Sequence, residues 1–168
     1  MAIITSSTKV TERTTGTDER SGIMTDRQAP DWLDVLERCG LQFAGKAEQG
    51  GPPVNSAIYA VTGLEVEPAV TIPASSPRAA DELDAAWHHR ASQVRLYGRD
   101  GEFLILPPVP GGSKVGWVRV KDPVGKNLPS RVGRVAGSPE FVAVSPDGRR
   151  LCAASVEDDD YWVVLHEF

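Results

Sequence analysis

Two stretches of the chain repeat apolar residues at helical spacing. Residues 31–40 place apolar side chains at i, i+3, i+4 and i+7 between a capping aspartate and a glycine, which predicts a short helix over 31–39. A longer helix is predicted to follow Ser76 and Pro77, because a serine cap followed by proline suits a first helical turn. Its apolar stripe comprises Ala79, Ala80, Leu83, Ala86, Trp87, Ala91 and Val94.

Most other apolar segments alternate with a period of two, which indicates β-strands. We expect strands at 57–61, 64–66, 69–72, 94–97, 102–106, 115–121, 141–144, 150–156 and 161–168. The sequence Gly98–Gly101 predicts a hairpin turn, and Ser145–Gly148 has proline and glycine where a type I turn favours them. The last three strands are therefore expected to form an antiparallel meander.

These elements predict an α+β fold, an antiparallel sheet of five to seven strands with two helices packed on it. The strand 161–168 is apolar on both faces, since Trp162 and Val164 alternate with Val163 and Leu165. Such a strand is covered on both faces, or is covered on one face and forms an interface with the other. Two helices could cover one face, and a curled sheet could cover the second.

The chain is predicted to contain one domain, residues 31–168, preceded by a disordered tail, residues 1–30. The tail has ten Ser or Thr residues and few large apolar ones, so it cannot bury enough surface to offset the entropy of ordering. Met24 is an alternative start of the chain.

Composition narrows the class of protein. The chain has 18 Lys+Arg and 23 Asp+Glu, for a net charge of −5, and only residues 77–134 are basic. This balance disfavours a nucleic-acid-binding domain. No apolar run is long enough to span a membrane, and no secretory signal is apparent, so we expect a cytoplasmic protein. The 13 Arg against 5 Lys are typical of a GC-rich coding sequence and indicate a bacterial origin.

Candidate catalytic and cofactor motifs are incomplete. Asp84 lies one helical turn before His88, beside His89, which would suit a general base, but no recognisable nucleophile motif accompanies them. The two cysteines and three histidines lack the spacings typical of metal ligands, and the Gly111-Gly112-Ser113-Lys114 stretch lacks the first glycine of a phosphate loop. We therefore expect no metal and no cofactor.

The segment from Asp122 to Glu140 is rich in glycine and proline and is predicted to be a long loop, with a short strand at 131–136 as an alternative. Its basic residues would meet an acidic partner or a phosphate, and a neighbouring tryptophan would add an anchor if exposed. The candidate partner-binding residues are Trp117, Lys121, Lys126, Arg131 and Arg134.

These observations favour a non-catalytic protein–protein interaction module of a bacterial cytoplasm, such as an inhibitor, immunity or accessory protein. Its expected partner is another protein, of acidic character, and the sequence indicates no oligomeric state. The first alternative is a small hydrolase built on Asp84, His88 and His89, with His166 as a further candidate. The second is a nucleic-acid-binding module that uses the basic residues of 121–134.

Overall fold

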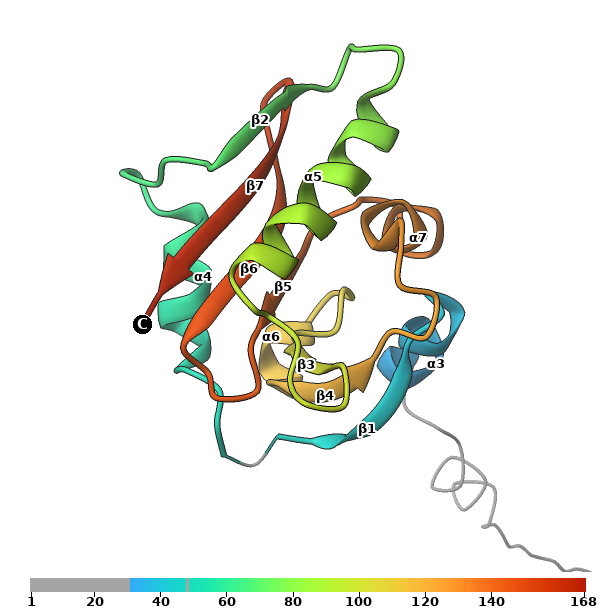
Figure 1. The fold of residues 1–168 in the computed structure, drawn as a ribbon, viewed down its shortest axis with the longest axis vertical. Helices are drawn as coiled ribbons and strands as arrows, with labels where there is room; N and C mark the ends of the chain where they lie inside the picture. Colours follow the sequence, from blue (N-terminus) through green and yellow to red (C-terminus); the bar gives the residue numbers. More distant parts are fainter. Residues whose placement is uncertain (1–30, 48) are drawn as a thin grey trace, which may run out of the picture. The chain divides into compact units, whose positions relative to one another are not determined.

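The computed structural model describes residues 31–47 and 49–168, which form five helices and seven strands (Figure 1). The predicted tail 1–30 and the alternative start Met24 lie outside the described residues. The helices are α3 (Asp31–Arg38), α4 (Val54–Thr62), α5 (Ala79–Gln93), α6 (Gly112–Val115) and α7 (Leu128–Ala136). The strands are β1 (Gln42–Lys46), β2 (Val70–Pro73), β3 (Glu102–Ile105), β4 (Val118–Lys121), β5 (Phe141–Val144), β6 (Arg150–Glu157) and β7 (Asp160–Glu167).

All seven strands belong to one antiparallel sheet, in the order β1-β4-β3-β5-β6-β7-β2. The predicted α+β class is confirmed, and the strand count is at the upper end of the expected range. The structure has more than the two predicted helices because three short ones lie in segments that the sequence pattern assigned to strands or loops.

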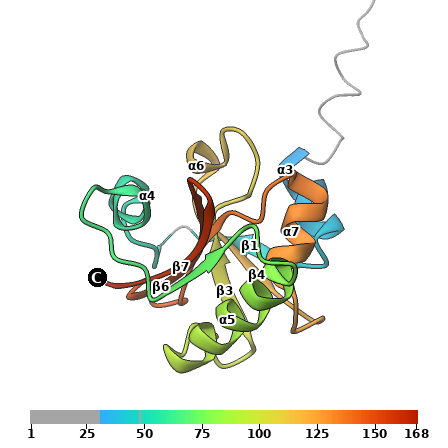
Figure 2. The ribbon, with the colours of Figure 1, turned by 90° about the horizontal axis from the view of Figure 1, so that it is seen from above.

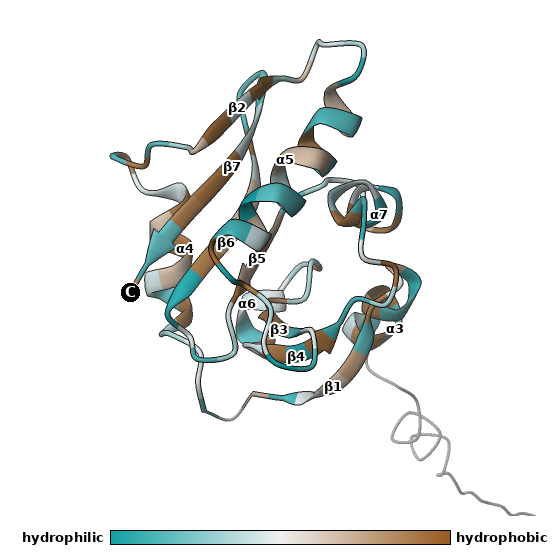
Figure 3. Ribbon diagram, in the orientation of Figure 1, coloured by the Kyte–Doolittle hydropathy of each residue, from teal (hydrophilic) through white to brown (hydrophobic). Residues whose placement is uncertain are grey.

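The two faces of the sheet bury separate apolar clusters. The first lies beneath α5, with Trp87 at its centre, and also receives apolar residues of α3 and α7. The second contains Ala57 and Val61 of α4, and α4 packs against β5 and β6. Figure 2 shows α4 and α5 on opposite sides of the sheet. The two-sided apolar character of β7, brown along its middle in Figure 3, is thereby explained: helices lie over both faces of the sheet.

The C-terminal meander forms as predicted. Strands β5, β6 and β7 pair in sequence, and the turn Ser145–Gly148 closes with a hydrogen bond from the Gly148 N–H to the Ser145 carbonyl, 2.8 Å. The Ser145 hydroxyl donates to Asp147 at 2.6 Å, and Asp147 also accepts the Arg149 N–H. These hydrogen bonds hold the pKa of the Asp147 carboxyl below its usual range.

The strands predicted at 57–61 and 64–66 are wrong. Residues 54–62 form α4, whose buried and half-buried residues Val54, Ala57, Ile58 and Val61 have the spacing of a helical face. Pro53 precedes the first turn and Gly63 caps the last, with its N–H bonded to the Tyr59 carbonyl at 2.8 Å. The β-branched residues favoured a strand locally, but burial of one helical face against the sheet decides the conformation.

The strand predicted at 94–97 is wrong, and the one predicted at 115–121 is wrong in part. Residues 94–97 are not a strand, because α5 continues to Gln93 with Val94 as its C-cap, and Arg95 then takes a left-handed φ of 56°. Residues 112–115 form the single turn α6, so β4 begins only at Val118. The sequence pattern also missed β1, an exposed edge strand with an irregularity between Phe43 and Gly45, because its side chains do not alternate between buried and exposed.

The predicted loop 122–140 contains α7, so its loop assignment and the alternative strand at 131–136 are both wrong. Leu128, Arg131, Val132 and Val135 follow the i, i+3, i+4, i+7 pattern and lie buried or half-buried. Asn127 is the N-cap, Pro129 occupies the first turn and Gly137 ends the helix with a φ of 90°. The glycines and prolines of this segment therefore mark the two ends of a helix.

Candidate protein-binding surface

The proposed catalytic carboxylate and imidazole lie at the junction of α5 and α7, but they do not bond to each other. Asp84 accepts the backbone N–H of Ser130 at 2.9 Å and its hydroxyl at 2.6 Å. His88 accepts the backbone N–H of Leu128 through Nε2 at 3.0 Å. Both side chains of α5 therefore bind N–H groups in the first turn of α7, which have no partner within their own helix.

This geometry corrects the arrangement on which the hydrolase alternative depends. Both oxygens of Asp84 are engaged by Ser130, and the Nε2 lone pair of His88 is already used. His166 lines a different depression from that of His88, at the ends of β6 and β7. The imidazoles are thus not gathered in one cleft, and the two residues expected to form an acid–base pair act as caps of a neighbouring helix.

We expect the His88 cap to make stability depend on pH. Burial lowers the pKa of His88 below its usual 6.5, and Arg131 lowers it further, while Asp122 and Asp84 oppose the shift. The unfolded chain therefore takes up a proton more readily than the folded one, so the free energy of unfolding falls as the pH decreases below 6.5. A protonated Nε2 also cannot accept the Leu128 N–H.

The measurement is urea denaturation at several pH values for the wild type, His88→Gln and His89→Gln. His89 is exposed and lies next to His88, so His89→Gln is the matched control. His88→Gln should flatten the pH dependence below 6.5, whereas His89→Gln should leave it unchanged. Parallel curves for the wild type and His88→Gln would contradict this role.

Arg131, a predicted partner-binding residue, is buried and engaged inside the protein. Its side chain is 8% exposed, and its guanidinium lies 2.7 Å from the carboxylate of Asp122, which is 4% exposed. It also donates to the carbonyls of Cys39 and Lys126, each at 2.6 Å, and to the side chain of Asn127 at 3.1 Å. Arg131 thus joins α3, the turn 122–127 and α7, and its guanidinium has little surface to offer a partner.

The other predicted binding residues differ in their exposure. Trp117 is only 6% exposed, and its indole N–H donates to the Pro52 carbonyl at 2.8 Å, so it cannot act as a surface anchor without rearrangement. Lys121 is half-buried at the end of β4, between β1 and β3. Lys126 and Arg134 are exposed, in the turn before α7 and on α7 itself. Partner binding by these residues stays a prediction, and Lys126 and Arg134 are the two that the structure leaves exposed.

A more apolar surface lies on the α4 side. A groove of about 280 Å³ lies beside α4. One wall is formed by Ile58, Val61 and Thr62 of α4, and the other by the segment 106–113, which leads into α6. Strands β5 and β6 form its floor. We call it the α4 groove. Most of its lining is apolar, and the backbone of its loop wall is held by Leu106, whose N–H donates to the Val142 carbonyl at 3.1 Å.

Exposed apolar side chains also lie on α4 and just after it. Leu64 comes two residues after the end of α4 and is 100% exposed, and Tyr59, on the outer side of α4, is 64% exposed. The helix itself carries no charged residue. An uncharged helix beside an apolar groove, with a fully exposed leucine at its end, is the kind of surface that proteins use for docking.

The charged side chain in the lining of the α4 groove is acidic. Glu140 lines the groove, and its carboxylate accepts the Ser138 hydroxyl at 3.2 Å and the Val156 N–H at 3.1 Å. Glu65 and Glu67 follow Leu64 and are exposed. The sequence pattern missed this surface because residues 57–66 were interpreted as two strands, although the spacing of the apolar positions in 54–61 could have shown the helix.

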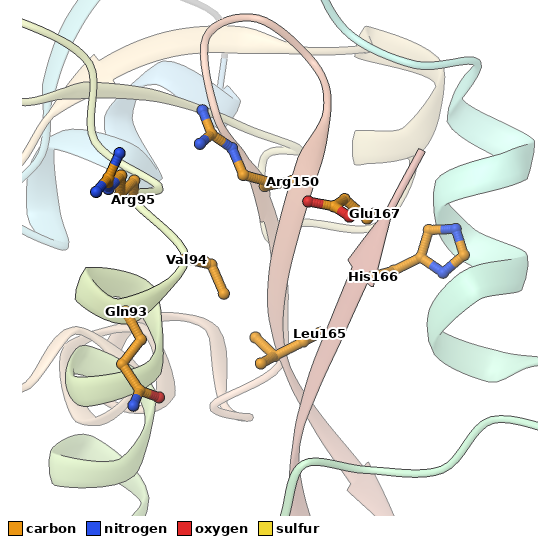
Figure 4. Close-up of a pocket in the computed structure, with 7 residues that line it drawn as sticks. All are labelled: Gln93, Val94, Arg95, Arg150, Leu165, His166 and Glu167. Atoms are coloured by element: carbon orange, nitrogen blue, oxygen red, sulfur yellow. The ribbon is translucent and has the colours of Figure 1, made fainter.

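A second, open depression of about 630 Å³ lies between the C-terminal end of α5 and the adjoining ends of β6 and β7 (Figure 4). Gln93, Val94 and Arg95 form one wall, and Arg150, Leu165 and Glu167 form the sheet side. We call it the arginine groove. Arg150 reaches Asp147 at 3.2 Å, whereas Arg95 and Glu167 make no ion pair within the part of the chain described.

Neither cysteine has the environment of a reactive thiol. Cys39 and Cys152 are both buried, and burial raises the pKa of each thiol.

Among residues 31–47 and 49–168, no group of three His, Cys, Asp or Glu side chains is placed to hold a metal ion. Within the same residues, no helix has the length and apolarity needed to cross a membrane.

The exposed surfaces of the protein are therefore the features that best indicate a function. The α4 groove has a mostly apolar lining with one carboxylate, that of Glu140, and exposed apolar residues lie on α4 and just after it. The α5–α7 junction, in contrast, is occupied by its own hydrogen bonds. Comparisons of the chain with family models, with curated proteins and with solved structures found no match.

Proposed function

We propose that this chain is a non-catalytic protein-binding module that docks a partner protein on the α4 groove. The observation that carries the proposal is Leu64, which is fully exposed two residues after α4, an uncharged helix that itself forms one wall of the apolar groove. Burying one leucine side chain is worth roughly 1.5–3 kcal/mol, so this residue alone would contribute about tenfold or more to affinity.

The rim chemistry indicates the kind of partner. Glu140 lines the groove, and the exposed Glu65 and Glu67 follow Leu64 along the chain, so a partner segment with apolar residues flanked by Lys or Arg would complement these residues. This differs from the acidic partner expected from the basic residues of 121–134. An inhibitor, immunity or accessory role in a bacterial cytoplasm would fit such a module and is part of this proposal.

Two synthetic peptides of equal length test the partner chemistry directly, one made of leucine and lysine and the other of leucine and glutamate. The lysine peptide should bind at least tenfold more tightly in a fluorescence-anisotropy titration. Glu65→Lys should weaken its binding, and Glu37→Lys, on the exposed side of α3, is the control for the same change of charge. Tighter binding of the glutamate peptide would instead support the acidic partner and the basic residues Lys126 and Arg134.

The apolar contribution is tested by Leu64→Ser, with Val124→Ser as the matched control. Both residues are exposed apolar side chains, 100% and 46% exposed, and Val124 lies in the predicted basic segment. Leu64→Ser should weaken binding of the lysine peptide, and of any partner captured from the native host, by about tenfold, while Val124→Ser leaves it unchanged. Equal binding by Leu64→Ser and the wild type would contradict docking on the α4 groove.

A further inference from the structure

Within the part of the chain described, one half of β7 has no strand paired with its outer edge. β2 pairs with β7 only from Asp160 to Val163, and α4 packs against β5 and β6. The remaining half of β7, which ends at Glu167, continues past β2 (Figure 1). An open strand edge of this kind is a template for pairing with another strand.

The register shows which backbone groups point outward there. The Val163 carbonyl faces β2, because it accepts the N–H of Ala69 at 2.8 Å. Backbone groups in an antiparallel strand alternate between its two sides, so the N–H and C=O of Leu165 and Glu167 also point outward. On the inner side the Phe168 N–H donates to the Arg149 carbonyl at 2.9 Å, in agreement with this alternation.

The opposite edge of the sheet, β1, is less suited to pairing. Its register shifts between Phe43 and Gly45, and it ends in an exposed lysine, Lys46. Irregularities of this kind and edge lysines are the features by which proteins protect strand edges.

We propose that a second copy of this chain pairs with the open half of β7, so that two β7 strands lie antiparallel about a two-fold axis at His166. In this register Leu165 of one copy lies opposite Glu167 of the other, and each such pair exchanges both of its N–H···O bonds. The two His166 residues lie opposite each other as a pair without hydrogen bonds between them. The same surface serves both copies, as closed two-fold assembly requires.

The charges of the arginine groove complement this arrangement. Figure 4 shows Leu165 pointing toward α5 and His166 toward α4. Glu167 of the second copy would lie beside Leu165, on the α5 side, at the mouth of the groove that holds Arg95 and Arg150. Glu167 and Arg95 are without an ion-pair partner among residues 31–47 and 49–168, so the pairing would supply one for each.

Sedimentation equilibrium of the full chain at high micromolar concentration tests the charge pairing. The wild type should have about twice the mass of one chain, 18.1 kDa. Glu167→Arg and Arg95→Glu should each weaken dimerisation by at least tenfold, and the double variant should dimerise more tightly than either single one. Lys46→Glu makes the same change of charge as Arg95→Glu, but on β1 at the other edge of the sheet, and should leave the dimer unchanged. A monomeric wild type, or a double variant weaker than both singles, would overturn the proposal.

A cysteine at the proposed axis tests the register. Opposite residues of this kind of pair have Cα atoms about 4.5 Å apart, within the range that a disulfide spans. His166→Cys should therefore form a disulfide-linked dimer on mild oxidation, whereas Gln42→Cys, on the β1 edge, should not. The native cysteines are buried and do not compete. Absence of the linked dimer, or equal linkage in both variants, would overturn this register, and neither result depends on peptide binding to the α4 groove.

Discussion

Replacing Arg131 by alanine should lower the free energy of unfolding by about 3–5 kcal/mol, because it leaves a buried carboxylate without its partner. The side chain of Asp122 is 4% exposed and lies 2.7 Å from the guanidinium of Arg131. The substitution also leaves the carbonyls of Cys39 and Lys126 without the donor they have in the folded protein. Urea denaturation at pH 7 measures the effect.

The matched control is Arg134→Ala, because Arg134 is on the same helix and is exposed. It should change the free energy of unfolding by less than about 0.5 kcal/mol. The double variant Asp122→Asn/Arg131→Ala should be more stable than Arg131→Ala alone, since the buried charge is then removed. A loss of partner binding with unchanged stability in Arg131→Ala would instead show that the predicted surface role of this arginine is right.

Replacing Gly148 by alanine should lower the free energy of unfolding by about 3 kcal/mol, for two separate reasons. Gly148 has a φ of 76°, where an L-residue is strained, and a Cβ atom at this position would overlap the backbone carbonyl of Gly50. The substitution therefore opposes both the conformation of the Ser145–Gly148 turn and its contact with the Gly50–Gly51 segment.

Gly101→Ala separates the two contributions. Gly101 has a similar φ of 78°, but a Cβ atom there would have no neighbour within 4 Å. It should cost only about 1 kcal/mol, the backbone contribution. Similar losses in urea denaturation for both variants would show that the close approach of Gly50 is relieved without cost and that the turn conformation alone matters.

The polar contacts around α7 connect its stability to its surroundings. Asp84 and His88 bind the first turn of α7 from α5, and Arg131 binds the carbonyl of Cys39 at the end of α3. The residues that resemble catalytic groups in the sequence are thus used to place a helix. That use explains why a carboxylate and an imidazole occur one turn apart on α5 without forming a pair.

Elements with a long, regular pattern could be predicted from the sequence. The stripe of α5 and the alternation of β5, β6 and β7 extend over enough residues for one period to dominate, and the glycine and proline of Ser145–Gly148 specify the turn between two of these strands. The α+β class follows from these elements alone.

Short elements were assigned wrongly because their local preference is weak and the tertiary contacts decide. Residues 57–61 have the β-branched character of a strand, but they form part of α4 because Ala57 and Val61 are buried against β5 and β6. Leu128 and Val132 of α7 are likewise buried, in the apolar cluster beneath α5. Their burial favours a helix in this glycine- and proline-rich stretch.

The candidate site depended even more on the tertiary structure. The sequence alone determined the class of fold, the long helix and the meander, because these depend on the periodic burial of neighbouring residues. It did not determine which residues are free to contact a partner. Arg131 is held by the carboxylate of Asp122 and by the carbonyl of Cys39, 92 positions earlier, whereas the apolar Leu64 is left exposed. Only the folded arrangement decides such partners, because desolvation and ion pairing act between groups that the chain brings together from distant positions.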